Sequence, residues 1–365
     1  MTRTPPSELD QALVAAVAEL GFAISAAQLE RWRTNLWLAR ATDCTDPDTG
    51  EPRPEAVHRA MCLAAASTPG RGISWLGWTF WAIDDTPASS ARLRAAVASA
   101  LQRPFRRNGV DVHQIPEGDS DAASDAREQL SVALLTGQRH PRKDFDGALR
   151  AAAADAAFEL PPPRSVPNMF HPALLDQGAR MLLGGADDTG FEDLADAWEA
   201  ASPANSALLD TMRTMNREAA LKGIDLFAQS PLADGLRGLV RAVQEADDRV
   251  LCAAVRACTK GNAVLSTLLI QRAPDDPAIL QTLMDDEMWD QWARVGGFAP
   301  VLGVGGEAAI ALNVFQYLTL PRWAGDLERY LTLMDTLLAP ECRRPGLVAA
   351  LPTAPRRQQE LGVGR

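Results

Sequence analysis

The chain has 365 residues and a formal net charge of −11. A single core rarely grows beyond about 250 to 300 residues, so the length predicts two domains. Long stretches rich in Ala and Leu predict an almost wholly α-helical protein. The negative charge argues against a protein whose whole surface coats nucleic acid, because phosphate binding needs a basic footprint.

Membrane segments and metal-binding patterns are both missing from the sequence. No stretch reaches the roughly 18 to 20 apolar residues that span a bilayer, and the first residues lack the apolar run of a signal peptide. We therefore expect a cytoplasmic protein with no membrane partner. The five cysteines lack CxxC spacing and adjacent histidines, which favours buried thiols over disulfides or a zinc site. No metal or cofactor is expected.

The N-terminal region begins with two helices whose ends are marked in the sequence. Ser7 is placed to cap a first helix, and Gly21 supplies its C-terminal stop. Ser25 and Gln28 form an S-x-x-Q capping box that opens a second helix. These signals predict a pair of short helices before residue 40.

A polar segment and three more helices follow. DCTDPDTGEPR, at residues 43–53, is long enough for a small two-stranded wing or a loop. Pro54 starts a helix in the first-turn position that proline tolerates. The apolar run ISWLGWTFWAI predicts the next helix, and Thr86 with Pro87 launches another.

This order of elements resembles the N-terminal winged helix-turn-helix domain of MerR-type transcription regulators, over residues 22–102. The matching pieces are SAAQLERW at 25–32 for the recognition helix, LWL at 36–38 for the end of that unit, PEAV at 54–57 for the next helix, and 73–101 for the two closing helices. The resemblance implies a DNA-binding domain at residues 1–102, whose second helix enters the major groove.

The resemblance also implies which side chains contact bases and phosphates. They are Gln28, Arg31, Arg33, Arg40, Arg53 and Arg59. The leading hypothesis is therefore a cytoplasmic transcriptional regulator that binds double-stranded DNA. An exposed, charged helix face on a domain that does not bind DNA is the alternative interpretation of the same residues.

The expected wing has an unusual charge for a DNA-binding element. It contains four carboxylates, at Asp43, Asp46, Asp48 and Glu51. Arg53 is its only base, and residues 1–102 hold nine arginines against eleven carboxylates, a net charge of −2. Carboxylates near phosphate are repelled, most strongly at low salt. A second hypothesis is thus a protein-interaction adaptor that binds a basic partner through these four acids.

Three tryptophans in the apolar helix share roughly one face at helical spacing: Trp75, Trp78 and Trp81. Packing of the indoles inside a core is the favoured interpretation. The alternative is an interface through which the small domain dimerises or docks on the C-terminal part of the chain.

The rest of the chain predicts a linker, a large helical domain and a tail. Residues 103–120 have the Pro, Gly and Asn content of a linker. Residues 121–351 predict a multi-helical dimerisation or sensor domain, with long helices over 204–228 and 232–259. Residues 352–365 are polar without an apolar period and predict disorder. We expect a homo-oligomer.

No catalytic pattern stands out. DDEMWD at 285–290 is similar to the Mg²⁺ motif of isoprenoid synthases, but the second metal motif of that family is missing after Asn313. The glycines at 303–306 precede a helix without the strand or the Lys-Ser/Thr of a phosphate loop. A third hypothesis, a helical enzyme or small-molecule binder, rests only on the size of the C-terminal part.

Overall fold

The computed structural model describes residues 7–67, 73–136, 171–201, 206–228, 230, 232–266 and 306–337. Within these ranges the chain forms thirteen α-helices, and the only β pairing there is an isolated antiparallel bridge between Thr45 and Pro52. The all-α prediction is confirmed for this part of the chain. None of its helices is both long and apolar enough to cross a membrane.

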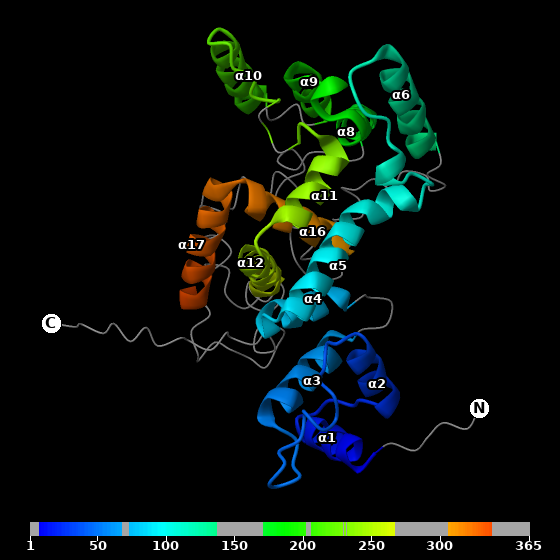
Figure 1. The fold of residues 1–365 in the computed structure, drawn as a ribbon. Coiled ribbons are helices and arrows are strands. Elements are labelled where there is room, and N and C mark those ends of the chain that lie inside the picture. The colour runs from blue at the N-terminus through cyan, green and yellow to red at the C-terminus, as the bar shows by residue number, and fades with distance from the viewer. Residues whose placement is uncertain are drawn as a thin grey trace, which may run out of the picture.

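The first three helices form the lower part of the molecule in Figure 1, and we call residues 7–67 the head. They are α1 (Glu8–Glu19), α2 (Ala26–Thr34) and α3 (Pro54–Ala66). Ser7 caps α1 by accepting a hydrogen bond from the Asp10 backbone N–H, and Ser25 with Gln28 forms the expected capping box on α2. The predicted starts of both helices are therefore confirmed.

The next helix, α4 (Ser74–Asp84), belongs to two hydrophobic cores at once. Its Leu76 and Phe80 side chains pack into the head core, together with buried Leu29 and Trp32 of α2. Its Trp78 side chain lies in the larger core that the later helices build. The division between the two cores therefore lies inside α4 and not at residue 102, where the sequence suggested a domain boundary.

The stretch expected to be a linker is part of the larger core. Helix α5 (Pro87–Arg106) starts at the Thr86 cap and extends into the predicted linker. Beyond it, Val110, Val112 and Ile115 are buried, because a short 3-10 turn (Val112–Gln114) folds this segment back onto the helices. These three apolar residues argue against a linker, but the Pro, Gly and Asn content of the segment hid that signal in the sequence.

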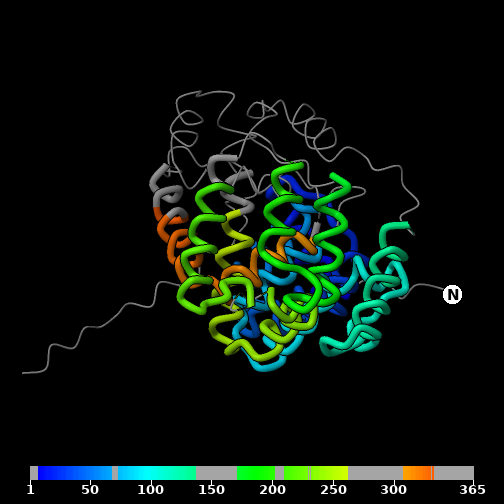
Figure 2. The backbone as a smooth tube through the Cα atoms, turned by 90° about the horizontal axis from the view of Figure 1, so that it is seen from above, coloured from blue at the N-terminus to red at the C-terminus, as the bar shows by residue number. Residues whose placement is uncertain are grey.

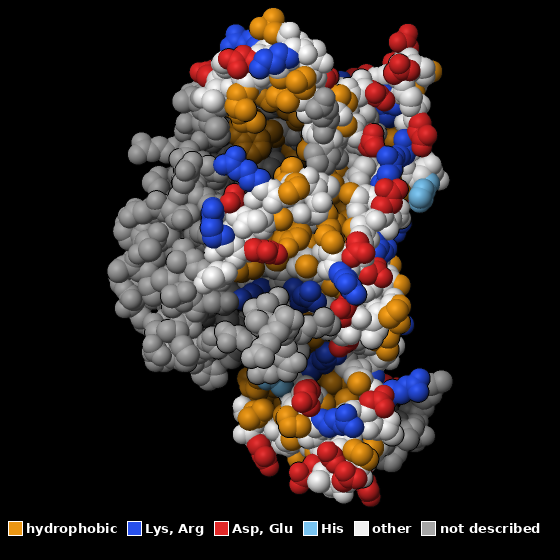
Figure 3. Space-filling view, turned by 60° about the vertical axis from the view of Figure 1, so that its left-hand side comes forward, with side chains coloured by type: hydrophobic (Ala, Val, Ile, Leu, Met, Phe, Trp, Pro, Cys, Tyr) orange, Lys and Arg blue, Asp and Glu red, His pale blue; other side chains and the backbone are white. Residues whose placement is uncertain are grey.

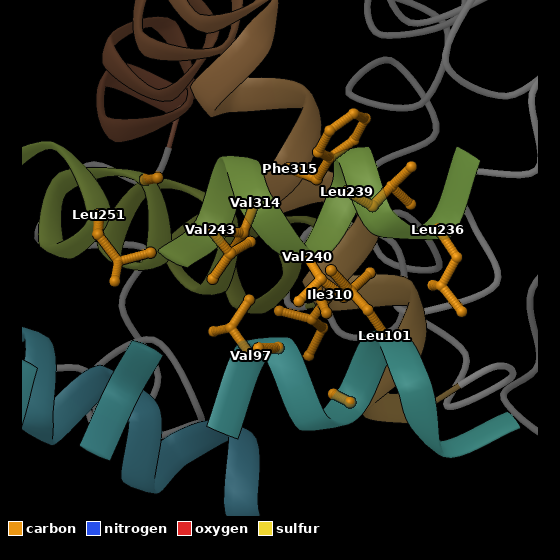
Figure 4. Packing of buried hydrophobic residues seen from close by; sticks show 14 of the residues in the cluster. Val97, Leu101, Leu236, Leu239, Val240, Val243, Leu251, Ile310, Val314 and Phe315 are labelled. Atoms are coloured by element: carbon orange, nitrogen blue, oxygen red, sulfur yellow. The ribbon is translucent and has the colours of Figure 1, made fainter. Parts of the chain in front are cut away.

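The larger core joins helices that are far apart in the sequence. Helix α5 packs against α11 (Gly235–Glu245), α12 (Asp248–Ser266) and α16 (Gly306–Thr319), and α17 (Pro321–Leu337) covers α12 and α16. Figure 4 shows the side chains that meet there: Val97, Leu101, Leu236, Leu239, Val240, Val243, Leu251, Ile310, Val314 and Phe315. We call this part of the molecule the body.

Four further helices lie at the end of the body opposite the head (Figure 1). They are α6 (Asp121–Thr136), α8 (Pro172–Gly184), α9 (Phe191–Ala201) and α10 (Ser206–Ala220). Each of these helices packs on the next one in the list: α6 packs on α8, α8 packs on α9, and α9 packs on α10. The view from above in Figure 2 shows α6 and α17 on opposite sides of the molecule.

Two predicted helices are shorter than the sequence suggested. The helix expected over 232–259 is broken between α11 and α12, because the Arg94 guanidinium binds the carbonyl oxygens of Val243 and Ala246 at the end of α11. Asp247 then starts α12 by accepting a hydrogen bond from the Arg249 N–H. The helix expected over 204–228 ends at Ala220, where turns begin.

Several sequence predictions lie outside the described residues. They are the acidic motif at 285–290, most of the glycine segment at 303–306, and the tail at 352–365.

Candidate interaction surface of the head

The polar segment between α2 and α3 is a short hairpin that its own backbone holds in shape. The Asp46 N–H donates to the Glu51 carbonyl at 2.8 Å, and the Arg53 N–H donates to the Cys44 carbonyl at 2.8 Å. Gly50 closes the turn with φ of +72°, a conformation that glycine adopts without strain. We call residues 43–53 the acidic hairpin.

The four carboxylates of the acidic hairpin do not have equal roles. The Asp46 carboxylate accepts hydrogen bonds from the Asp48 and Thr49 backbone N–H groups, at 2.9 and 3.1 Å. These donors hold the pKa of Asp46 below its usual range. The side chains of Asp43, Asp48 and Glu51 are exposed and make no ion pair within the described residues. Asp46 therefore shapes the turn, and the other three acids face solvent.

Negative charge gathers at the free end of the head. Figure 3 shows carboxylate side chains crowded at the lower tip of the molecule, where the head lies in Figure 1. Arg53, the only base of the acidic hairpin, is exposed, and its Nε donates to the Thr45 carbonyl at 3.2 Å. This hydrogen bond keeps the Arg53 side chain at the base of the hairpin.

Two of the side chains expected to contact DNA make contacts inside the head. The Gln28 amide oxygen accepts the Ser25 N–H at 2.9 Å as half of the capping box. Arg33 pairs with Asp10 of α1 at 2.5 Å, and its Nε donates to the Ala39 carbonyl at 3.1 Å. Both groups hold α2 in place within the head, and neither points freely to solvent.

Arg59 is also engaged within the molecule. Its two terminal nitrogens bind the Asp84 carboxylate of α4, at 2.6 and 3.2 Å. The guanidinium carbon lies 4.7 Å from the centre of the Phe80 ring, which adds a cation–π contact. Arg59 therefore joins α3 to α4, a role that sequence reasoning missed because its partner is twenty-five residues away.

Arg31 and Arg40 are the two expected contacts that remain free. Both side chains are exposed and form no ion pair within the described residues. Arg31 lies in the last turn of α2, where a positive charge complements the negative end of the helix dipole. Of the six side chains in the expected DNA-binding set, the structure leaves only these two without an internal partner.

Cys44, one of the five cysteines expected as buried thiols, is buried beside the arginines of the head. Its thiol donates to the Ala39 carbonyl at 3.4 Å. Burial raises the pKa of the Cys44 thiol, and the positive charges of Arg33 and Arg59 offset part of that effect. A thiol with a raised pKa is a poor nucleophile, so burial assigns Cys44 a packing role.

The three tryptophans, for which core packing was the favoured interpretation and an interface the alternative, lie where the head meets the body. Trp78 is buried in the body core, while Trp75 and Trp81 are partly buried and pack against both cores. The Trp81 indole N–H donates to the Leu36 carbonyl of the head at 3.1 Å. Within the chain, these indoles therefore connect its own two parts.

A glycine in α4 makes this contact close. A Cβ atom placed at Gly77 would lie 2.0 Å from the indole nitrogen of Trp37, so only glycine fits there. The glycine inside the apolar run WLGW was the one sequence signal for this approach. The Trp37 indole packs on the bare backbone of α4 and joins the head to it.

Among the described residues, no three His, Cys, Asp or Glu side chains are grouped so that they could hold a metal ion.

Comparisons of the chain with protein-family models, with curated proteins and with solved structures found no match. The resemblance to MerR-type regulators therefore rests on the residues quoted above.

Proposed function

We propose that the head is a protein-interaction module that presents the acidic hairpin to a basic region of a partner protein. The order of two capped helices, a hairpin and a third helix supports a winged-helix shape for the head. In this proposal the shape serves to display charge, and the protein acts as an adaptor.

One observation carries the proposal: two of the five arginines in the expected DNA-binding set are paired with carboxylates of the same chain, while acids of the hairpin are not paired. Arg33 is held by Asp10 and Arg59 by Asp84. The acidic hairpin meanwhile displays the unpaired carboxylates of Asp48 and Glu51. Such a surface repels phosphate and attracts basic side chains, which also increases the rate of association.

The DNA-binding regulator stays as the second candidate because Arg31 and Arg40 are exposed. Two arginines can contact two phosphates, and a regulator of this kind would be expected to dimerise for adequate affinity. The cytoplasmic location and the homo-oligomeric state remain expectations on either proposal.

Affinity capture with matched charge variants tests the adaptor proposal. The first variant combines Asp43→Asn, Asp48→Asn and Glu51→Gln, which neutralise the hairpin and leave Asp46 to shape the turn. The control variant neutralises three exposed acids elsewhere on the head, with Glu8→Gln, Glu19→Gln and Glu30→Gln. We expect a basic protein that binds the wild-type chain and the control and binds the hairpin variant more weakly. Its binding to the wild-type chain should weaken as salt is raised.

Two results would count against the proposal. Capture of the same proteins by the wild-type chain and the hairpin variant would show that the hairpin carries no recognition. Capture of nucleic acid alone by the wild-type chain, and its loss in a variant with Arg31→Ala and Arg40→Ala, would favour the DNA-binding candidate.

A further inference from the structure

The end of the molecule opposite the head carries an unpartnered apolar surface. Helix α10 packs on α9 and projects from the body (Figure 1). Met212 is 42% exposed, Met215 is 59% exposed, and Ile224 in the following turn is 37% exposed. Large apolar side chains gathered on an exposed helix and the turn after it are typical of a binding surface.

A groove lies beside this apolar surface. It has a volume of about 420 Å³ and opens to solvent between the start of α9 and the end of α10. Its apolar lining comes from Phe191, Ala220 and Ile224. The volume falls in the range of roughly 300 to 1,000 Å³ that ligand sites occupy, and the open side allows a side chain to enter from a larger partner.

The charged residues that line the groove are all acidic. They are Glu192, Asp193 and Asp225. Within the described residues, Asp193 and Asp225 accept hydrogen bonds from backbone N–H groups and form no ion pair. Glu192 lies 3.4 Å from Arg213, but that arginine is shared with three other carboxylates.

The wider surroundings have the same sign of charge. Residues 190–201 and 206–228 together hold seven carboxylates and three basic side chains, a net charge of −4. An apolar groove surrounded by carboxylates complements a ligand that is apolar on one side and basic on the other.

We propose that α9, α10 and residues 221–226 form a docking surface for a basic amphipathic helix of a partner protein. One apolar side chain of that helix enters the groove between Phe191 and Ile224. Its neighbours a turn away pack on the flexible Met212 and Met215 side chains, and its Lys or Arg residues pair with Asp193 and Asp225.

This surface is separate from the acidic hairpin and does not depend on it. Figure 3 shows apolar side chains on the upper part of the molecule, where α10 lies in Figure 1, and the crowded carboxylates at the opposite tip. Variants of one surface therefore leave the other intact, and the two proposals fail independently.

Fluorescence anisotropy with labelled synthetic peptides tests the proposal on the full chain. The probe has Leu at helical positions i, i+3, i+4 and i+7 with Lys between them, and a scrambled peptide of the same composition is the control. One variant combines Met215→Gln with Ile224→Gln. The other combines Asp193→Asn with Asp225→Asn, since the amide oxygen of Asn can accept the same three backbone hydrogen bonds.

We expect the amphipathic peptide to bind the wild-type chain on the order of tenfold more tightly than the scrambled peptide, and each double variant to lose about that factor. A control variant with Glu8→Gln and Glu30→Gln, two exposed acids of the head outside both surfaces, should bind as the wild type does. Equal binding of both peptides, or unchanged binding by both groove variants, would overturn the proposal. The wild-type chain could instead bind no peptide and form a dimer that Met215→Gln dissociates. That result would assign the surface to a second copy of the chain and would also overturn the proposal.

Discussion

Arg59 of α3 and Asp84 of α4 form a two-point ion pair at the junction of head and body, with nitrogen to oxygen distances of 2.6 and 3.2 Å. The same last turn of α4 is held from the other side, where Arg256 of α12 donates to the Ala82 carbonyl at 2.7 Å. The end of α4 is thus the point where an arginine from each part of the molecule attaches.

Replacing Arg59 by Ala should lower the free energy of unfolding by about 1 to 3 kcal/mol, because a charged two-point hydrogen bond and a cation–π contact are lost together. Urea denaturation followed by tryptophan fluorescence measures the change. Arg92→Ala is the matched control, since Arg92 is exposed on α5 and forms no ion pair within the described residues. Equal effects of both substitutions would show that the Arg59 contacts contribute nothing.

Gly77→Ala should destabilise the junction by about 3 kcal/mol, near the upper end of overpacking effects, because the new methyl group collides with the Trp37 indole. Near-ultraviolet circular dichroism should lose signal from the displaced indole. Gly178→Ala in α8 is the control, since its Cβ would meet no atom within 4 Å, and it should be neutral or slightly stabilising. A stable Gly77→Ala variant with an unchanged spectrum would contradict the close approach of Trp37 to α4.

Arg127 and Asp188 form a buried ion pair that fixes α6 to the segment after α8. Their side chains are 2% and 8% exposed, and two hydrogen bonds of 2.6 Å join them. Asp188→Asn should cost about 3 to 5 kcal/mol, since the arginine is left buried without its counter-charge. Thermal unfolding at neutral pH measures this loss.

The same pair should make stability fall in acid. The hydrogen bonds from Arg127 hold the pKa of Asp188 below its usual range. Its contribution is therefore fully present above the unfolded Asp pKa of about 3.9 and is lost as the pH falls through the lower folded value. Wild-type stability should fall more steeply than that of Asp188→Asn below about pH 4, and parallel curves would contradict the assignment.

The buried cysteines should not react while the protein is folded. Cys44, Cys62, Cys252 and Cys258 are all buried, and burial raises the pKa of the Cys62 thiol to about 12. In a Cys342→Ser variant, Ellman's reagent at pH 8 should therefore label no thiol until urea is added. Rapid labelling of a thiol in the native chain would show that the head or the body opens locally.

Local features of the fold were predictable because their signals lie within a few residues. The Ser25 and Gln28 capping box is three residues long, and Pro54 marks the start of α3 by its own geometry. Leu29 and Trp32, three residues apart in the sequence, share the buried face of α2, as helical spacing requires. These elements follow from short-range chemistry that one sequence displays.

The candidate site was harder to predict because its pairings are distant in sequence. Arg33 looked like a DNA contact until Asp10, twenty-three residues earlier, was found to bind it. The break between α11 and α12 depends on Arg94, about 150 residues earlier. A single sequence shows that an arginine is present but not which carboxylate or carbonyl meets it in space.

Electrophoretic retardation of genomic DNA fragments across a salt series tests the central claim, that the acidic hairpin makes the head a protein-binding and not a DNA-binding module. We predict no retardation by the wild-type chain even at low salt, where phosphate contacts are strongest. Retardation that weakens steeply with salt, and that disappears on replacing Arg31 and Arg40 by Ala, would contradict it.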